Sequence, residues 1–229
     1  MAKTAILVDG GFYRKRSYAL WGDRTPEDRA TELKNYVFKH IDKRDGPFER
    51  ELYRVFYYDC PPSDANAYNP RTGKTFNLKR DPTYAWANGF FDCLKRQRKF
   101  ALRMGRISDA SVGYDINRKT LKRLCRGEIK VEDLEDSDFH PAWRQKGVDM
   151  KLGLDISSLA YEGIVNQIVL IAGDSDFVPA AKVARRKGID FILDPMGASV
   201  SPDLFENIDG METFIRRDPL QRHEKRRQQ

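Results

Sequence analysis

IVLIAGDSDF, residues 168–177, begins with a continuous apolar run that is rich in β-branched side chains. Such a run is typical of a strand buried on both faces, as in the parallel sheets of α/β proteins. Asp174 and Asp176 follow the run one residue apart, and Ser175 between them can cap a helix over residues 180–188. The stretch therefore predicts two acids at the carboxyl end of a buried parallel strand, which is where open α/β sheets bind ligands.

The two carboxylates can be interpreted in two ways. Negative charges this close repel each other, and a divalent metal ion would compensate them. Alternatively, Asp174 and Asp176 only cap the helix, because Asp is among the preferred N-cap residues. The pattern by itself leaves both interpretations open.

The start of the chain repeats this arrangement. Residues 4–8 predict a short buried strand, and Asp9 and two glycines follow at its carboxyl end. A basic cluster comes next, with aromatic residues on either side, and consists of Arg14, Lys15 and Arg16. Such a cluster can hold RNA phosphates and stack a base, although the same pattern also fits a helix start with solvated cations.

The chain alternates between predicted helices and strands over most of its length. This order predicts an α/β fold in which helices cover both faces of a mainly parallel sheet. The pattern indicates strands at 4–8, 51–58, 100–107, 167–172 and 189–193, helices at 26–43, 82–99 and 148–161, a short helix at 204–208, an edge strand at 212–215, and a long loop at 63–80.

Two segments are dense in charge. The run Lys95, Arg96 and Arg98 leads into a predicted strand, which would place these cations near the acids as contacts for RNA phosphates, although most such runs are only a solvated face. Residues 108–144 hold basic and acidic clusters outside the helix–strand alternation. They are predicted to form an insertion whose acids lie in a solvated loop.

The predicted helix at 148–161 carries two further acids. Asp149 lies in its first turn, at the edge of the apolar stripe, where a carboxylate suits the helix dipole. Asp155 falls near the opposite edge, nearly two turns later, so a straight helix cannot easily bring both to one metal ion. We therefore expect Asp149 to be a ligand and Asp155 to support the site or the fold.

Composition limits the class of protein. The chain has 229 residues, 33% of them charged, and a formal net charge of +7, which favours a polyanionic partner such as RNA. The three cysteines and three histidines lack metal-ligand spacing, so neither zinc nor a disulfide framework is expected. Without a signal peptide or an apolar run of membrane-spanning length, the protein is predicted to be cytoplasmic, with no membrane partner.

Three motifs resemble the NYN domain, in the LabA-like branch of the PIN-like nucleases: Val8-Asp9-Gly10, Lys146-Gly147-Val148-Asp149 and Gly173-Asp174-Ser175-Asp176-Phe177. The resemblance covers roughly residues 4–196, and 60–145 carry little of it. It implies a Rossmann-like three-layer α/β/α sandwich, RNA cleavage, and Mg²⁺ or Mn²⁺ bound by Asp9, Asp149, Asp174 and Asp176. Ser175 and Asp155 would then support these ligands. Many similar proteins have Asn where this chain has Phe12.

The chemistry of these residues agrees with phosphodiester hydrolysis, because carboxylates hold hard cations that activate water and polarise phosphoryl oxygens. The sequence thus predicts a metal-dependent ribonuclease. One alternative is an RNA-binding or regulatory module with little turnover. Another is a phosphatase resembling the haloacid dehalogenase superfamily, which Gly11 counts against because that family has a second Asp there.

The domain organisation follows from the same patterns. Residues 1–215 are predicted to form the nuclease domain, with the insertion at about 108–145, and residues 216–229 form a basic tail. RNA is the expected partner, and neither DNA nor a homodimer is excluded.

Overall fold

The structure is a computed structural model that describes residues 1–42, 49–108 and 112–216. The chain forms two compact units. The first, called here the sheet unit, consists of Met1–Asp59, Gly89–Gly105 and Gly147–Gln229, and the second, the insert unit, of Cys60–Asn88 and Arg106–Lys146. The basic tail predicted at 216–229 lies outside the described residues from position 217 onward.

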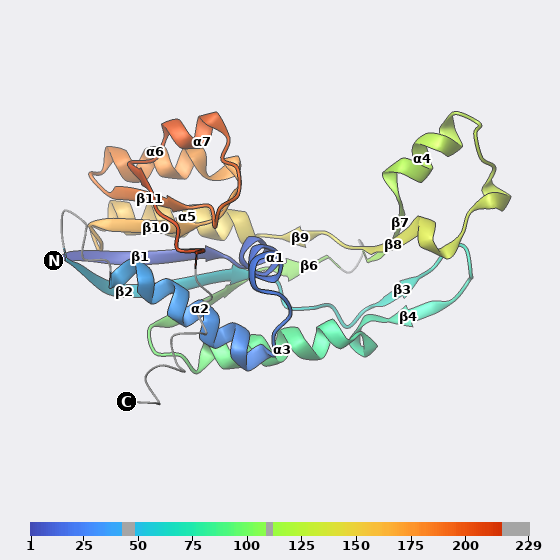
Figure 1. Ribbon diagram of the computed structural model, residues 1–229, viewed down its shortest axis with the longest axis horizontal. Coiled ribbons are helices and arrows are strands. Elements are labelled where there is room, and N and C mark those ends of the chain that lie inside the picture. Colours follow the sequence, from blue (N-terminus) through green and yellow to red (C-terminus); the bar gives the residue numbers. More distant parts are fainter. Residues whose placement is uncertain (43–48, 109–111, 217–229) are drawn as a thin grey trace. The chain divides into compact units, whose positions relative to one another are not determined.

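The sheet unit contains six parallel strands, which confirms the predicted α/β fold with a parallel central sheet (Figure 1). Largely apolar runs form its central strands. In the strand Gln167–Ile171, for example, all five residues are buried. In spatial order the strands are β12 (Gly210–Met211), β11 (Asp190–Asp194), β10 (Gln167–Ile171), β1 (Ala2–Asp9), β2 (Arg50–Asp59) and β5 (Phe100–Met104).

The strand order reverses at the centre of the sheet. From β1 the chain adds β2 and then β5 on one side, and from β10 it adds β11 and then β12 on the other. β1 and β10 are neighbours, with Val8 opposite Ile171. This is a topological switch point, and in open α/β sheets the crevice for ligands lies there, beyond the carboxyl ends of the two strands.

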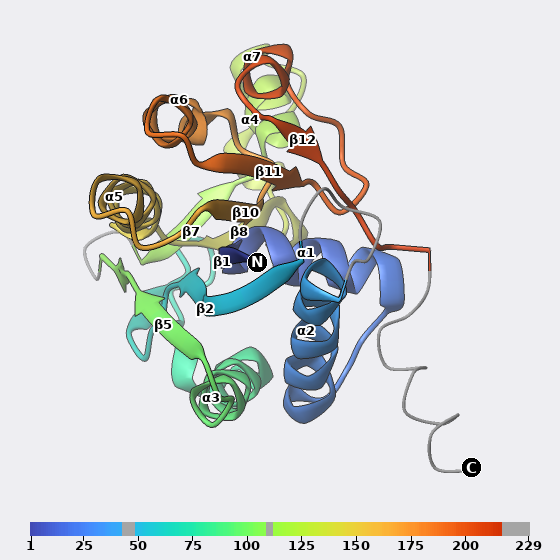
Figure 2. The same cartoon turned by 90° about the vertical axis from the view of Figure 1, so that its left-hand side faces the viewer.

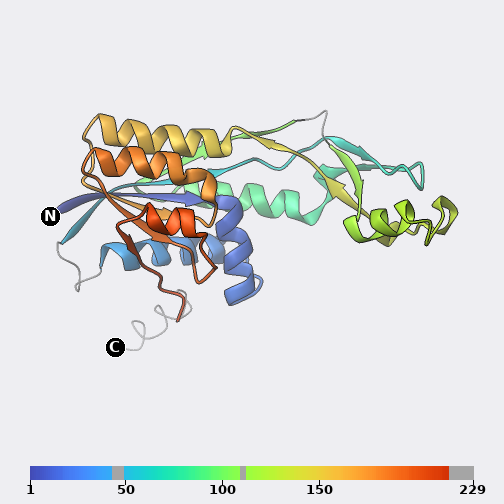
Figure 3. The same cartoon turned by 90° about the horizontal axis from the view of Figure 1, so that it is seen from above.

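Helices cover both faces of the sheet. Figure 2 shows α5 (Val148–Tyr161) and α6 (Val178–Arg186) on one face, and α1 (Gly10–Trp21) and α2 (Pro26–Ile41) on the other. Seen from above, the yellow α5 and the orange α6 lie side by side (Figure 3). The second half of α3 (Pro82–Lys95) packs its aromatic rings against Tyr57 of β2.

The insert unit consists of short elements. Three pairs of strands are antiparallel: β3 (Asn66–Tyr68) with β4 (Thr75–Asn77), β6 (Arg106–Ile107) with β9 (Gln145–Lys146), and β7 (Gly113–Ile116) with β8 (Phe139–Ala142). Helix α4 (Arg118–Cys125), three 3-10 turns and the first half of α3 complete the described part of this unit. The prediction of a long loop at 63–80 is therefore wrong, because a hairpin of three-residue strands forms there. The insertion predicted at 108–145 lies within this unit, which also includes residues 60–88.

Several predicted boundaries shift. The helix predicted at 82–99 ends at Lys95, since Lys99 has a left-handed backbone with φ of 66° before β5 begins. The prediction of an edge strand at 212–215 is wrong, because the edge strand of the sheet, β12, is Gly210–Met211. The short helix predicted at 204–208 is α7, at Pro202–Glu206. In the described part of the chain no helix is long and apolar enough to cross a membrane.

Candidate active site

Asp9 ends β1 and begins α1. Its Oδ1 accepts a hydrogen bond of 3.0 Å from the backbone N–H of Phe12, so it is the N-cap of the helix. The next residue must be small, because a Cβ on Gly10 would lie 2.6 Å from Oδ2 of Asp59 and from the hydroxyl of Tyr57. The glycine thus lets the turn after β1 approach the end of β2, which places Asp9 at the carboxyl edge of the sheet.

The environment of Asp9 disfavours its negative charge. Burial, and to a smaller extent the charges of Asp149 and Asp59, raise the pKa of Asp9 from 3.8 to about 6, although the hydrogen bond from Phe12 opposes this shift. A carboxyl group with this pKa loses its proton only near neutral pH. A cation bound beside Asp9 would accordingly stabilise its charged form.

Asp174 and Asp176 follow β10 across the switch point. Asp174 caps the 3-10 turn Ser175–Phe177, and its Oδ1 accepts a hydrogen bond of 3.0 Å from the backbone N–H of Asp176. The expectation that Ser175 caps the helix is wrong, because this extra turn precedes α6 and makes Asp174 the capping residue. Both acids are exposed. Capping therefore occupies one oxygen of Asp174 and does not exclude a second role.

Asp149 links the two sides of the edge. It lies in the first turn of α5, after Gly147, whose left-handed φ of 82° starts the helix. Partial burial raises the pKa of Asp149, and the charges of Asp174 and Asp176 raise it further. Since Asp149 in turn raises the pKa of Asp9, all four predicted ligands interact electrostatically at one edge of the sheet.

Other acids near this edge have partners that compensate them. Oδ2 of Asp155 accepts hydrogen bonds from the hydroxyl of Tyr58, at 2.8 Å, and from Nε of Arg103, at 2.9 Å. Asp59, buried at the end of β2, accepts hydrogen bonds from Arg14, at 2.9 Å, and from the hydroxyl of Tyr57, at 3.0 Å. These contacts fix both carboxylates in the fold.

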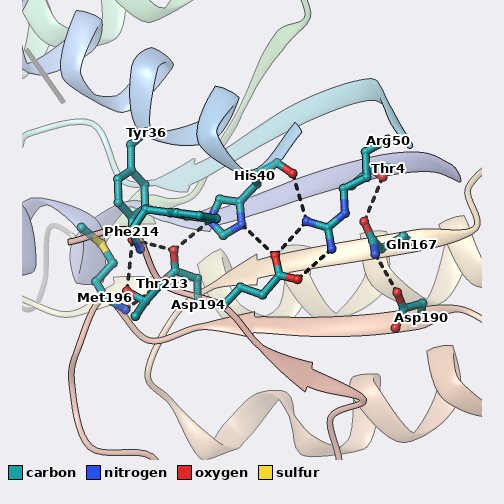
Figure 4. Close-up of polar contacts among 11 residues, drawn as sticks. Thr4, Tyr36, His40, Arg50, Gln167, Asp190, Asp194, Met196, Thr213 and Phe214 are labelled. Atoms are coloured by element: carbon teal, nitrogen blue, oxygen red, sulfur yellow. Dashed lines mark hydrogen bonds and ion pairs between the residues drawn. The ribbon is translucent and has the colours of Figure 1, made fainter. Parts of the chain in front are cut away.

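Asp194, at the end of β11, is also compensated. It is fully buried, and its Oδ2 lies 2.6 Å from the hydroxyl of Tyr36 and 2.8 Å from Nε2 of His40 (Figure 4). His40 is itself a core residue, since its side chain is fully buried. Asp194 was not predicted as a site residue, and its contacts assign it to the core.

The candidate ligands differ from these acids in lacking a counter-charge. Within the described residues no Lys, Arg or His lies in ion-pair distance of Asp9, Asp149, Asp174 or Asp176. An all-carboxylate set, in which the pKa values of Asp9 and Asp149 are raised, fits a hard cation such as Mg²⁺ or Mn²⁺ in its donor chemistry. The described residues nevertheless include no three His, Cys, Asp or Glu side chains that are already arranged to hold an ion. Binding would therefore require side-chain rearrangement.

The predicted phosphate contacts separate into two groups. Arg14 is bound to Asp59, and Arg16 donates hydrogen bonds of 2.8 and 3.3 Å to the backbone carbonyl of Met196, so both are engaged inside the fold. Lys15 is exposed.

The second basic run lies at the amino end of β5. Lys95 pairs with Asp92 at 2.9 Å, and Arg96 and Arg98 are exposed. Because Met104 is opposite Asp59 and Phe100 opposite Val55, this run lies about 13 Å along the strand from the acidic edge. The topology thus does not bring it to the acids.

The NYN domain family matches residues 83–208, more than half of the chain. This protein belongs to the NYN domain family. The matched span contains Asp149, Asp174 and Asp176, and the NYN domain is a PIN-like nuclease family whose members act on nucleic acid and generally use divalent metals. Asp9 lies outside the span and is placed at the site by the register of β1 with β10.

The other comparisons add little to this NYN domain. No curated protein sequence matches the chain. A solved structure reported as "Structural Basis for the Mechanism and Regulation of Sir2 Enzymes" is similar with a TM-score of 0.33 and 10% identity, over 100% of this chain and 94% of that one. With a TM-score this low, the two chains need not share a topology.

Proposed function

We propose that this NYN domain is a metal-dependent ribonuclease that hydrolyses RNA phosphodiester bonds at the acidic edge of the sheet unit. One observation carries the proposal. Asp149 repels Asp9 on one side and Asp174 and Asp176 on the other, without a counter-charge among the described residues, whereas their acidic neighbours are compensated. Uncompensated charge of this kind is unfavourable for folding and is typical of a functional site.

The roles follow from the positions of these acids. A bound Mg²⁺ or Mn²⁺ would supply an activated water and charge neutralisation at the phosphate. Asp9 and Asp149 would hold it from the two sides of the switch point, with Asp174 and Asp176 completing the set. A cation at this edge would also keep Asp9 ionised at neutral pH, since it opposes the burial that raises its pKa.

The cations proposed to contact RNA are those left exposed. Lys15, Arg96 and Arg98 have no ion-pair partner among the described residues, whereas Arg14 pairs with Asp59, Arg16 donates hydrogen bonds to the backbone carbonyl of Met196, and Lys95 pairs with Asp92. Contacts of this kind position a strand by its phosphates and carry no sequence preference. The proposal therefore names RNA as a class of substrate and no particular sequence.

The test is a cleavage assay with Mn²⁺ against EDTA on labelled single-stranded RNA and on DNA of the same sequence. Asp149→Asn should lower the rate by orders of magnitude, because a metal-bound water and a polarised phosphate supply several kcal/mol of the barrier reduction. Glu162→Gln, at the other end of α5, is the matched control and should cleave like the wild type.

Two outcomes would count against the proposal. Full activity of Asp149→Asn in Mn²⁺ would remove that residue from the chemistry. RNA binding without any cleavage by the wild type would favour the binding-module alternative, which the dispersed arrangement of the acids also suits. Cleavage of DNA alone would retain the metal site and change the substrate class.

A further inference from the structure

Helix α4 of the insert unit concentrates cations on a small helix. Its eight residues include Arg118, Lys119, Lys122 and Arg123, and Arg126 follows at its C-cap. All five side chains are exposed. The acidic clusters further along the same segment would be the natural counter-charges, so their actual contacts decide whether this face is neutralised.

The acids of the insert unit are used elsewhere. Asp138 accepts a hydrogen bond of 2.7 Å from the hydroxyl of Thr120 and one of 2.8 Å from the backbone N–H of Glu135. Asp133 accepts from the backbone N–H of Lys130, and Asp136 pairs with Arg71 at 2.8 Å. These carboxylates thus stabilise turns, and Asp138 also holds α4 through Thr120, but none of them forms an ion pair with Arg118, Lys119 or Lys122.

Only the C-terminal cations of α4 have a carboxylate nearby. Glu128 lies 4.0 Å from Arg123 and 3.6 Å from Arg126. Across the described residues no carboxylate lies within ion-pair distance of Arg118, Lys119 or Lys122. Three positive charges are therefore left uncompensated on one short helix.

The anchoring of α4 keeps these cations at the surface. Thr120 is the buried residue of the helix, and its hydroxyl is held by Asp138. Asn117, at the N-cap, donates a hydrogen bond of 2.7 Å to the backbone carbonyl of Ser137. With this side of the helix fixed, Arg118, Lys119 and Lys122 stay exposed.

The positions of two cations are unfavourable for the helix itself. Arg118 and Lys119 lie in its first turn, which contains no acid. The helix dipole disfavours positive charge there. A local arrangement that opposes stability without compensation within the fold is a sign of function. An anionic ligand would compensate both the cations and the dipole.

We propose that the exposed face of α4, formed by Arg118, Lys119 and Lys122, binds the phosphate backbone of RNA. The choice of RNA as the polyanion rests on the proposed ribonuclease function. Lys and Arg that neutralise phosphates release counter-ions, which gives affinity without sequence preference and a strong dependence on salt. The insert unit would thus carry an RNA-binding surface of its own.

The experiment measures binding without cleavage. Fluorescence anisotropy of a labelled 20-nucleotide single-stranded RNA is recorded in EDTA, from about 0.05 to 0.5 M KCl, for the wild type and for the triple variant Arg118→Gln, Lys119→Gln, Lys122→Gln. Gln retains helix propensity, so α4 should persist. The matched control neutralises three exposed cations of the same unit, as Lys74→Gln, Lys79→Gln, Arg80→Gln.

The α4 variant should reduce the log–log salt slope by about 2, because each lost contact on a single strand removes about 0.7. Over a tenfold range of salt this slope corresponds to an affinity loss of up to about 100-fold. The control variant has the same change in net charge, and its log–log salt slope should fall by less than half as much as that of the α4 variant.

An unchanged salt slope of the α4 variant would overturn the proposal, and so would an equal loss of slope in both variants. Binding of each variant to vesicles of anionic phospholipid is measured in parallel. Unchanged RNA binding with lost vesicle binding would also overturn the proposal, because it would assign the face to a membrane surface. Circular dichroism of each variant excludes unfolding as the cause of a loss. Since no metal is present and no bond is cleaved, this result is independent of whether the acids prove catalytic.

Discussion

The guanidinium of Arg14 donates a hydrogen bond of 2.9 Å to Oδ1 of Asp59, whose side chain is fully buried at the end of β2. The hydroxyl of Tyr57 donates to the other oxygen of Asp59. The charge of Asp59 still raises the pKa of Asp9, so this pair lies beside the candidate metal site. Arg14, expected from the sequence to meet RNA, is thus the internal counter-ion of a strand-end acid.

Arg14→Gln should destabilise the fold by about 2–3 kcal/mol. Breaking a buried ion pair costs about 3–5 kcal/mol because the remaining charge is left uncompensated, and the partial exposure of Arg14 reduces this. Urea denaturation at pH 7 measures the difference. The double variant Arg14→Gln, Asp59→Asn should recover much of it, since both charges are then gone. A loss of RNA affinity by Arg14→Gln without a loss of stability would instead make Arg14 a phosphate contact.

Asp9→Asn should stabilise the metal-free protein at neutral pH. The pKa of Asp9 is raised, so between about pH 4 and 6 the folded state binds the proton more tightly than the unfolded state, and stability falls as pH rises. At about 1.4 kcal/mol per pKa unit, the charged form costs up to about 3 kcal/mol. Denaturation in EDTA should show the variant more stable than the wild type at pH 7.5 and equal to it near pH 4.

The same pKa predicts how Mn²⁺ should act. The shift in melting temperature that Mn²⁺ causes should grow as pH rises through about 6, because a ligand must be deprotonated to bind the ion. Asp9→Asn should abolish most of that shift, whereas Glu162→Gln should retain it. A shift independent of pH would place Mn²⁺ at another site.

The central strands were predictable because each is a local feature. The stretches at 4–8, 51–58, 167–172 and 189–193 are mainly apolar, each with at most two polar or charged residues, and burial on both faces of a parallel sheet favours such runs. The acids at the ends of these strands were visible for the same reason. Short strands such as β3 have no comparable pattern, and the hairpin was therefore missed.

The partners of those acids were not predictable. Arg14 lies 45 residues from Asp59, and His40 lies 154 residues from Asp194, so each pairing depends on how the sheet brings distant segments together. Strand-end acids look alike in the sequence, whereas in the structure some are compensated and others are not. Candidate ligands can be separated from structural acids only after the fold is known.

Asp155→Asn should behave differently from the candidate ligands. It weakens the contacts with Tyr58 and Arg103 and should cost about 1 kcal/mol, because Arg103 is itself substantially exposed. Arg103→Gln should lower the stability by a similar amount if the contact between Arg103 and Asp155 is the cause. The Mn²⁺ dependence of cleavage should be that of the wild type. A changed Mn²⁺ requirement would move Asp155 into the metal site.

Gly173→Ala should disturb the loop after β10 through Phe12. A Cβ on Gly173 would lie 2.6 Å from Cε2 of the Phe12 ring. The ring would therefore have to move to make room for it. Such overpacking typically costs about 1–3 kcal/mol. Thermal unfolding measures the loss, and Phe12→Leu in the same chain should restore part of it. If the double variant is no more stable than Gly173→Ala, the ring is not the obstacle.

His40 should make the stability of the sheet unit depend on pH. Burial opposes the charge of His40, but the hydrogen bond with Asp194 and the charge of Glu212, whose Oε2 lies 3.8 Å from Nδ1, outweigh it and raise its pKa. Glu212 is in turn held by two hydrogen bonds from Arg50, at 2.8 and 2.9 Å. The protonated imidazole therefore joins α2 to the end of β11 and to the segment after β12.

For a histidine with a raised pKa, this stabilisation is complete below about pH 6.5 and is lost as pH rises through the folded-state pKa. His40→Gln should accordingly be less stable than the wild type by about 2–3 kcal/mol at pH 6, since hydrogen bonds to charged groups contribute about 1.5–3 kcal/mol. The difference should narrow toward pH 9. Tyr36→Phe, which removes an uncharged donor to Asp194, should lower stability equally across this range. Should the difference for His40→Gln stay constant or widen with pH, the imidazole is neutral in the fold and packs there without its charge.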